Sequence, residues 1–185
     1  MLKNSAARYG SVTKALHWFS AVLVFCLLAI GLTMGDAPLA DRIRLYNLHK
    51  SLGILVLALS LSRVVWHIFS KKPALVASLK PYEKKAAHVA HVLLYAALLG
   101  MPMSGWLMSS AHGRSVSFFG LFQLPDFVTQ NPALAERLET VHETMAYALM
   151  AMIALHVVAA IKHHVIDKDN TLRRMLPFGG AKEEA

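Results

Sequence analysis

The sequence predicts an all-α protein, a four-helix bundle that spans a membrane. The chain of 185 residues is 56% hydrophobic and only 16% charged, with a mean hydropathy of +0.45. It holds four apolar stretches of about twenty residues, each long enough to cross a bilayer as a helix. Each stretch also contains at least one histidine. Ordinary spanning helices avoid ionisable groups because such groups are costly in a membrane, so these histidines are candidates for function.

The four predicted spans cover residues 16–34, 48–69, 86–109 and 141–166. We expect them to pack together as a single membrane domain covering residues 1–185, with no separate soluble domain. The first apolar stretch is longer than the hydrophobic part of a signal peptide, so we expect it to remain as a span.

The connections between the spans follow from local signals. Residues 35–47 are expected to form a short outer loop, residues 70–85 a basic inner loop, and residues 110–140 the longest loop. Within this longest loop, Pro132 stands at the first turn of a short helix predicted over residues 133–139, which leads into the fourth span.

The net charge of +8 is distributed by membrane side and does not indicate nucleic-acid binding. Fourteen of the nineteen Lys and Arg residues fall on the side of the two termini, and five on the other side. Basic loops stay in the cytoplasm, so we expect both termini to be cytoplasmic. The basic inner face also suits the anionic headgroups of membrane lipid. The single cysteine, Cys26, excludes an internal disulfide, and the absence of a C-x-x-C-H motif means that any haem is held non-covalently.

The spacing of two histidines in the fourth span is the strongest functional signal. His142 and His156 are fourteen residues apart. At about 100° per residue they lie on nearly the same face of a helix, and at about 1.5 Å per residue they are roughly 21 Å apart along its axis. One helix therefore offers a metal ligand near each surface of the hydrocarbon core, as two stacked haems require.

Depth in the membrane predicts a partner for each of these ligands. His49 begins the second span at the outer surface, like His142, and His17 begins the first span at the inner depth of His156. Each pair joins two helices, as a haem iron with two imidazole ligands requires. A small residue follows each histidine by one turn and leaves room for a flat macrocycle: Ala21, Gly53, Ala146 and Ala160.

Spacing alone leaves the inner partner open. His67 lies eighteen residues after His49 on nearly the same face, and His88 and His91 open the third span near the inner surface. Any of these three could replace His17 as the inner ligand.

Two charged residues are candidates to support the haems. Arg63 is fourteen residues after His49, so it shares that face at the inner depth, where a haem propionate is the obvious anion for a guanidinium. Glu143, next to His142, is a candidate to orient that imidazole.

The sequence resembles the bacterial cytochrome b-561 family from about Tyr9 to Pro177. The resemblance rests on the order and spacing of several short motifs. These are Leu16-His17-Trp18, residues 47–53 (NLHKSLG), residues 88–95 (HVAHVLLY), residues 101–106 (MPMSGW), His142-Glu143, His156 with His163-His164, and residues 168–177 (KDNTLRRMLP).

The resemblance implies four membrane helices, two b-type haems and electron transfer across the bacterial inner membrane. By position, the haem ligands would be His17, His49, His142 and His156. A branch of the family oxidises superoxide at the periplasmic side and reduces ubiquinone, so a superoxide:ubiquinone oxidoreductase is the expected activity. Superoxide, ubiquinone and membrane lipid are then the expected partners.

Charged side chains near each surface bear on these two substrates. At the inner surface, Lys162 with His163 or His164 is expected to hydrogen-bond the quinone. The outer charges nearly cancel, so attraction of the superoxide anion depends on local clustering of three cations near the outer haem: Arg42, Arg44 and Lys50.

Two other functions are compatible with membrane histidines. A haem-b subunit that carries electrons for a separate dehydrogenase or hydrogenase has the same ligands but no substrate of its own. A histidine-lined path for metal ions or protons is disfavoured, because the sequence shows no internal repeat and no acidic ligand in the interiors of the spans.

Overall fold

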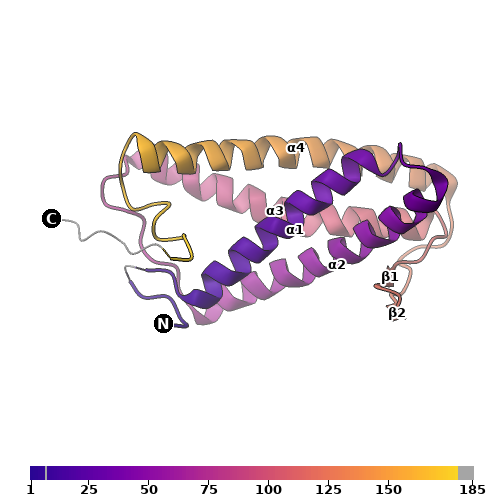
Figure 1. Cartoon of the computed structure of the whole chain (residues 1–185), viewed down its shortest axis with the longest axis horizontal. Coiled ribbons are helices and arrows are strands. Elements are labelled where there is room, and N and C mark those ends of the chain that lie inside the picture. Colours follow the sequence, from indigo (N-terminus) through magenta and orange to yellow (C-terminus); the bar gives the residue numbers. More distant parts are fainter. Residues whose placement is uncertain (7, 179–185) are drawn as a thin grey trace.

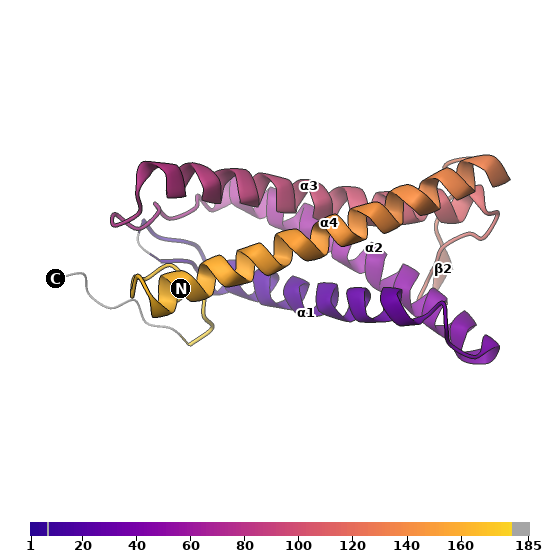
Figure 2. The same cartoon turned by 90° about the horizontal axis from the view of Figure 1, so that it is seen from above.

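The computed structural model describes residues 1–6 and 8–178, in which four long helices form one elongated bundle (Figures 1 and 2). The helices are α1 (Ser11–Thr33), α2 (Leu39–Phe69), α3 (Pro81–Ala111) and α4 (Pro132–Val165). Each is long and apolar enough to cross a membrane. The fold class predicted from the sequence is therefore confirmed, and the chain is an integral membrane protein.

The helices follow a simple up-and-down order. Each packs against the next in the chain, α1 on α2, α2 on α3 and α3 on α4. The chain enters α1 and leaves α4 at the same end of the bundle, which we call the terminal end (Figure 1). A short antiparallel hairpin of β1 (Ser117–Phe118) and β2 (Phe122–Gln123) lies at the other end, which we call the hairpin end.

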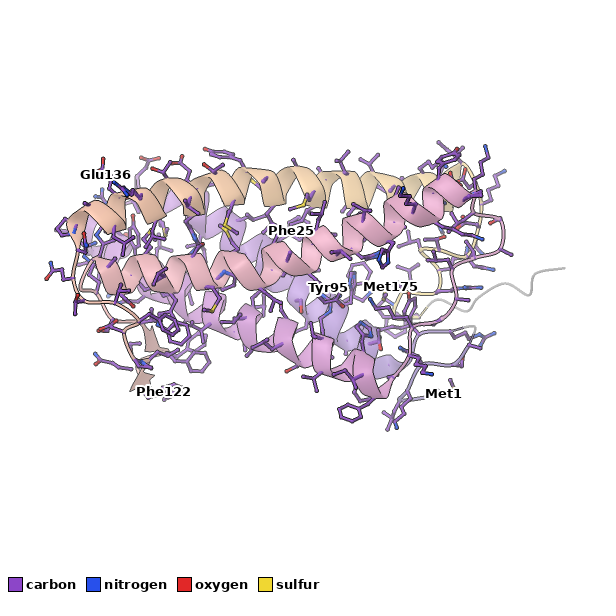
Figure 3. All side chains as sticks on the ribbon, turned by 180° about the vertical axis from the view of Figure 1, so that it is seen from behind. Met1, Phe25, Tyr95, Phe122, Glu136 and Met175 are labelled. Atoms are coloured by element: carbon purple, nitrogen blue, oxygen red, sulfur yellow. The ribbon has the colours of Figure 1, made fainter. Side chains whose placement is uncertain are left out.

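Labelled side chains in Figure 3 mark the two ends. Phe122 and Glu136 lie at the hairpin end, Met1 and Met175 lie at the terminal end, and Phe25 lies between them.

The beginning of α4 differs from the sequence prediction. The short helix predicted over residues 133–139 is not a separate element but the first part of α4, which runs unbroken from Pro132. The Asn131 side chain accepts a hydrogen bond from the Leu134 backbone N–H at 3.0 Å and so begins the helix. Neither glycine nor proline follows Pro132 before the fourth span, and therefore nothing stops the helix.

The outer loop predicted over residues 35–47 is also wrong for most of its length. Helix α2 begins at Leu39, directly after Pro38, with Asp41 in its first turn, where a carboxylate favours the helix dipole. The 31 residues of α2 extend over about 46 Å at 1.5 Å per residue. This length exceeds the hydrocarbon core of a bilayer, so the polar end of α2 protrudes from the membrane.

The buried core of the bundle is small and lies between the two ends. Leu23 and Val24 of α1 pack against Val56 of α2, and side chains of all four helices surround them: Leu27, Leu28, Leu52, Leu55, Leu59, Leu98 and Ile153. Many large apolar side chains instead point outward, for example Phe25 and Leu155. Such an exposed apolar surface fits a bundle whose surroundings are lipid.

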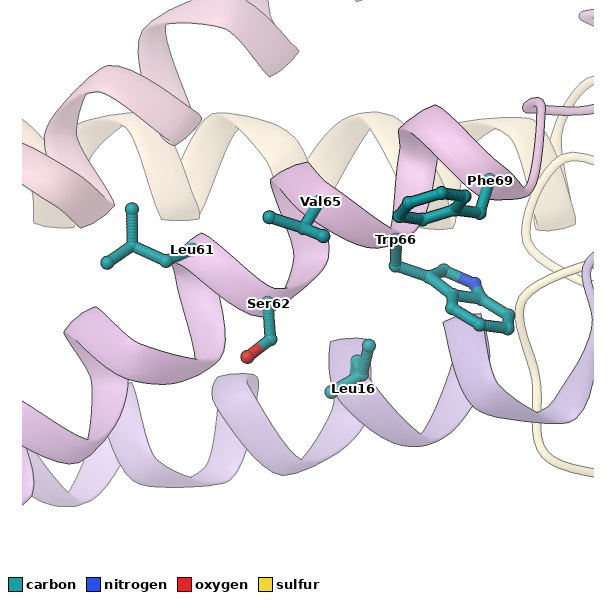
Figure 4. Close-up of a pocket in the computed structure, with 6 residues that line it drawn as sticks. All are labelled: Leu16, Leu61, Ser62, Val65, Trp66 and Phe69. Carbon is teal, nitrogen blue, oxygen red and sulfur yellow. The ribbon is translucent and has the colours of Figure 1, made fainter.

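A shallow hollow of about 380 Å³ separates α1 and α2 near the terminal end (Figure 4). Its lining is almost entirely apolar, as expected for a surface in contact with lipid. It is formed by Leu16, Leu61, Ser62, Val65, Trp66 and Phe69.

The residues after α4 fold back over the terminal end, and we call residues 167–178 the tail segment. The Lys14 ammonium donates a hydrogen bond to the Leu176 carbonyl at 2.8 Å. The Trp18 indole N–H donates to the Met175 carbonyl at 2.9 Å. A further hydrogen bond joins the tail segment to the loop between α2 and α3. The tail segment therefore fastens the beginning of α1 to the end of α4.

Candidate haem sites

The structure brings the four predicted ligand histidines together as two pairs. His49 of α2 faces His142 of α4 with 6.3 Å between the ring centres. His17 of α1 faces His156 of α4 with 6.4 Å between the ring centres. We call these the hairpin-end pair and the terminal-end pair. Both pairings follow the order of depth expected from the sequence.

These spacings fit a metal ion held between two imidazoles. A metal–imidazole bond is about 2 Å long, and the nitrogen lies about 1.2 Å from the ring centre, so two rings on opposite sides of one ion have centres about 6.4 Å apart. Both pairs have this spacing within 0.1 Å. The donor set, two neutral imidazoles from different helices, also fits a b-type haem.

Two glycines make room for the imidazoles of the hairpin-end pair. A Cβ atom on Gly105 of α3 would lie 2.9 Å from Cε1 of His142, and a Cβ atom on Gly31 of α1 would lie 3.3 Å from Cε1 of His49. By contrast, a Cβ atom on Gly53, which the sequence marked for its position after His49, meets nothing within 4 Å. The close approach of both rings to helix backbones therefore requires Gly105 and favours Gly31.

A serine on α3 fixes the His142 ring. The Ser104 hydroxyl lies 2.8 Å from the Met101 carbonyl and 2.9 Å from Nδ1 of His142. In the tautomer with its proton on Nδ1, His142 donates to Ser104, Ser104 donates to Met101, and Nε2 keeps a free lone pair for a metal. The predicted orienting residue Glu143 is instead exposed.

Three alternative inner ligands take different positions. Nε2 of His67 lies 3.0 Å from the Tyr95 hydroxyl. His88 is exposed on α3. The His91 ring centre is 5.7 Å from that of His156, shorter than the spacing for a shared metal ion, and its Nδ1 donates to the Ala87 carbonyl at 2.7 Å. The geometry therefore favours His17 as the partner of His156.

Arg63 lies beside the terminal-end pair, as its position fourteen residues after His49 indicates. Its charge acts on His17 and on His156. Its guanidinium carbon is 5.1 Å from the centre of the Tyr95 ring. Arg63 is thus placed to meet a negative group at the edge of this pair.

The three predicted quinone contacts have unequal surroundings. The Lys162 ammonium pairs with Glu83 at 2.9 Å and with Asp167 at 2.8 Å. Nδ1 of His163 lies 2.8 Å from a carboxylate oxygen of the same Asp167, and at the same distance from one of a second aspartate. Nδ1 of His164, by contrast, is buried and has no hydrogen-bond partner among the described residues.

Three features of these sites were not predicted from the sequence. Ser104, Gly105 and Gly31 all contact a histidine on a different helix, and no periodic pattern marks such a contact. The only available signal was that Ser104 and Gly105 stand within one of the family motifs, residues 101–106.

Comparison with known proteins identifies the family. The sequence matches the family model described as prokaryotic cytochrome b561 over residues 8–178. It is 37% identical to cytochrome b561 homolog 2 of Escherichia coli (strain K12), an alignment that covers 94% of this chain and 93% of the relative. It is 33% identical to cytochrome b561 homolog 1 of the same organism, over 92% of this chain and 97% of the relative. It is also 31% identical to the probable superoxide oxidase CybB of Yersinia pestis, over 92% and 96%. The chain therefore belongs to the prokaryotic cytochrome b561 family, whose members bind b-type haem and transfer electrons in membranes.

Proposed function

We propose that this protein binds two b-type haems and transfers electrons across the inner membrane from superoxide to ubiquinone. The observation that carries the proposal is the matched spacing of the two pairs, 6.3 Å for His49 with His142 and 6.4 Å for His17 with His156. The similarity to a protein named probable superoxide oxidase supports the choice of donor.

The four histidines determine what kind of redox chemistry fits. When bound, a b-type haem supplies one-electron redox chemistry. His49 with His142, and His17 with His156, would hold the two haems, and with two imidazoles on each iron the substrates would exchange electrons without binding to the metal. Two superoxide anions each lose one electron to give dioxygen, and one ubiquinone takes up the two electrons with two protons to give ubiquinol.

The distribution of charge supports an orientation for the proposed reaction. The excess of Lys and Arg on the terminal side favours a cytoplasmic location for that end, and the hairpin end would then face the periplasm. There the Lys50 ammonium, one residue after His49, donates a hydrogen bond to the Arg114 carbonyl at 3.1 Å. The positive charges of Lys50 and Arg114 lie near each other, with the Asp126 carboxylate also close to Lys50, so the two cations exceed the one nearby carboxylate and favour an anionic substrate.

Quinone reduction belongs at the terminal end in this proposal. Of the three side chains expected to contact the quinone, Lys162 and His163 are held by carboxylates. We assign the first contact to His164, because its buried Nδ1 has no partner among the described residues and can bond a quinone carbonyl.

The activity is tested with purified protein, a xanthine oxidase system as the superoxide source, and a short-chain ubiquinone. We expect ubiquinol to form at one molecule per two superoxide anions, and superoxide dismutase to suppress its formation. Ubiquinol formation that superoxide dismutase leaves unchanged would refute superoxide as the donor. A complete absence of ubiquinol, in protein with two reducible haems, would refute it as well. Stoichiometric co-purification of a dehydrogenase would then favour an electron-carrying subunit.

The choice of the inner ligand gives a separate prediction. We expect His17→Ala to lose one of the two haems and His91→Ala to retain both, because only His17 has the spacing to His156 of a shared metal ion. The haem content per chain, measured as the pyridine haemochrome, checks this directly. Two haems in His17→Ala and one in His91→Ala would exchange the roles of these residues.

A further inference from the structure

Two positive side chains share one aromatic ring at the terminal end. The Arg63 guanidinium carbon is 5.1 Å from the centre of the Tyr95 ring, and the Lys72 ammonium is 5.2 Å from the same point. Arg63 belongs to α2, Lys72 to the loop that follows it, and Tyr95 to α3. The hydrogen bond between the Tyr95 hydroxyl and Nε2 of His67 fixes the tyrosine in this position. Figure 3 labels Tyr95 between Phe25 and Met175, on the terminal side of the bundle.

These two cations lack an acidic partner. In the described ranges 1–6 and 8–178, no carboxylate lies within ion-pair distance of Arg63 or Lys72, and the one lysine in such a pair is Lys162. Partial burial lowers the pKa of Lys72, and the neighbouring Arg63 charge adds to this effect. A contact with an aromatic face is a weak interaction at an exposed site and leaves the positive charge in place. The pair therefore leaves positive charge that an anion would neutralise.

The position of these cations identifies the anion. Arg63 lies close enough to His17 and His156 for its charge to influence both. Lys72 lies beside His91, whose ring centre is 5.7 Å from that of His156. The two cations thus border the terminal-end pair, where two imidazoles fit a haem iron. A haem carries two propionate carboxylates, and a guanidinium with an ammonium provides the donors that carboxylates bind most strongly.

We propose that Arg63, Lys72 and Tyr95 form a carboxylate-binding site for the haem between His17 and His156. Arg63 was expected to meet a propionate, and the structure adds Lys72 as a second cation and Tyr95 as the ring on which both rest. His67 is a positioning residue that holds the tyrosine. This inference rests on the proposal of two haems per chain.

The first test compares two neighbouring lysines by redox titration. Loss of a cation beside the haem stabilises the ferric form, so Lys72→Gln is expected to lower one midpoint potential. A tenfold change in the ferric-to-ferrous ratio corresponds to about 59 mV for one electron. The affected transition is the one that disappears in His156→Ala. Lys71 is equally exposed but has no contact with Tyr95 among the described ring contacts, so Lys71→Gln is expected to change neither potential, while Lys72→Arg retains the wild-type value.

The second test observes the carboxylates themselves. Protein is produced with haem labelled with ¹³C at the propionate carboxylates, and redox-induced infrared difference spectra are recorded. We expect the label-sensitive carboxylate band of the terminal-end haem to shift in Lys72→Gln and in Arg63→Gln, and to stay in place in Lys71→Gln. If Arg63→Gln fails to retain haem, Lys72→Gln still decides the question, since Lys72 lies outside the helices.

The outcomes separate this inference from the function on which it rests. A labelled band that does not move in Lys72→Gln overturns the site, even when the potential falls, because the charge then acts only through its field. A shift of equal size in Lys71→Gln overturns it as well. A wild-type protein with fewer than two haems per chain instead removes the proposed function, and this count is made before either test.

Discussion

Replacement of His142 by alanine is expected to leave one haem per chain instead of two and to abolish electron transfer from superoxide to ubiquinone. The ring of His142 lies 6.3 Å from that of His49, and Nδ1 of His142 contacts the Ser104 hydroxyl at 2.9 Å. Loss of an outer partner of a metal ligand costs about 10–100-fold in affinity or activity, and loss of the ligand itself costs more. The pyridine haemochrome and a redox titration measure the haem content, and ubiquinol formation measures the transfer.

A second histidine near the same end provides the control for this prediction. His112 follows α3, and its Nε2 lies 3.9 Å from a carboxylate oxygen of Glu139. We expect His112→Ala to keep two haems and full transfer. Two normal haems in His142→Ala would contradict the assignment of the hairpin-end pair. Ser104→Ala is expected to have the smaller effect, because it removes only the partner that orients the ring.

Substitution of Gly105 by alanine is expected to have the next largest effect, a loss of about 10–100-fold in the affinity of the hairpin-end site for haem. The added Cβ atom would lie 2.9 Å from Cε1 and 3.3 Å from Nδ1 of His142. Either the imidazole or the helix must move, and both movements disturb the spacing to His49 and the bond to Ser104. Haem content per chain and the rate of haem transfer to excess apomyoglobin measure the loss.

Gly100 is the matched control for this substitution, because it lies on the same helix at a similarly close contact. Its added Cβ atom would meet only the terminal methyl of Met145 at 3.2 Å, and a methionine side chain moves easily. We expect Gly100→Ala to retain both haems. Equal haem loss in Gly100→Ala and Gly105→Ala would show that both glycines serve helix packing and that the contact with His142 is not decisive.

The fold and the histidine pairs could be predicted because both depend on periodic features of the sequence. Four apolar stretches give four spans, and the fourteen-residue step from His142 to His156 puts two imidazoles on one face. The limits of the helices were less predictable. A hydropathy pattern ends a predicted span where polar residues begin. Helices α2 and α4 continue through such residues, because these are good helix formers and no glycine or proline interrupts them there.

Periodic patterns of this kind do not predict which side chains of different helices are in contact. Ser104 meets His142 across 38 positions of sequence, and Gly105 meets the same ring. Arg63 was predicted from its step of fourteen residues after His49, but Lys72 follows the end of α2 and shares no period with it. Arg63, His67 and Lys72 meet the Tyr95 ring only through the packing of α2 on α3.

The tail segment has a consequence for how the protein is made. It follows α4 in the chain, so it leaves the ribosome after all four helices have been synthesised. Its hydrogen bonds with Lys14 and Trp18 join residues 162 and 157 positions apart, and Trp18 stands directly after His17. By contrast, the hairpin-end pair is complete in sequence once His142 has been made. In the proposed dihaem protein we therefore expect the hairpin-end site to be completed before the terminal-end site, because His156 and the tail segment are synthesised after His142.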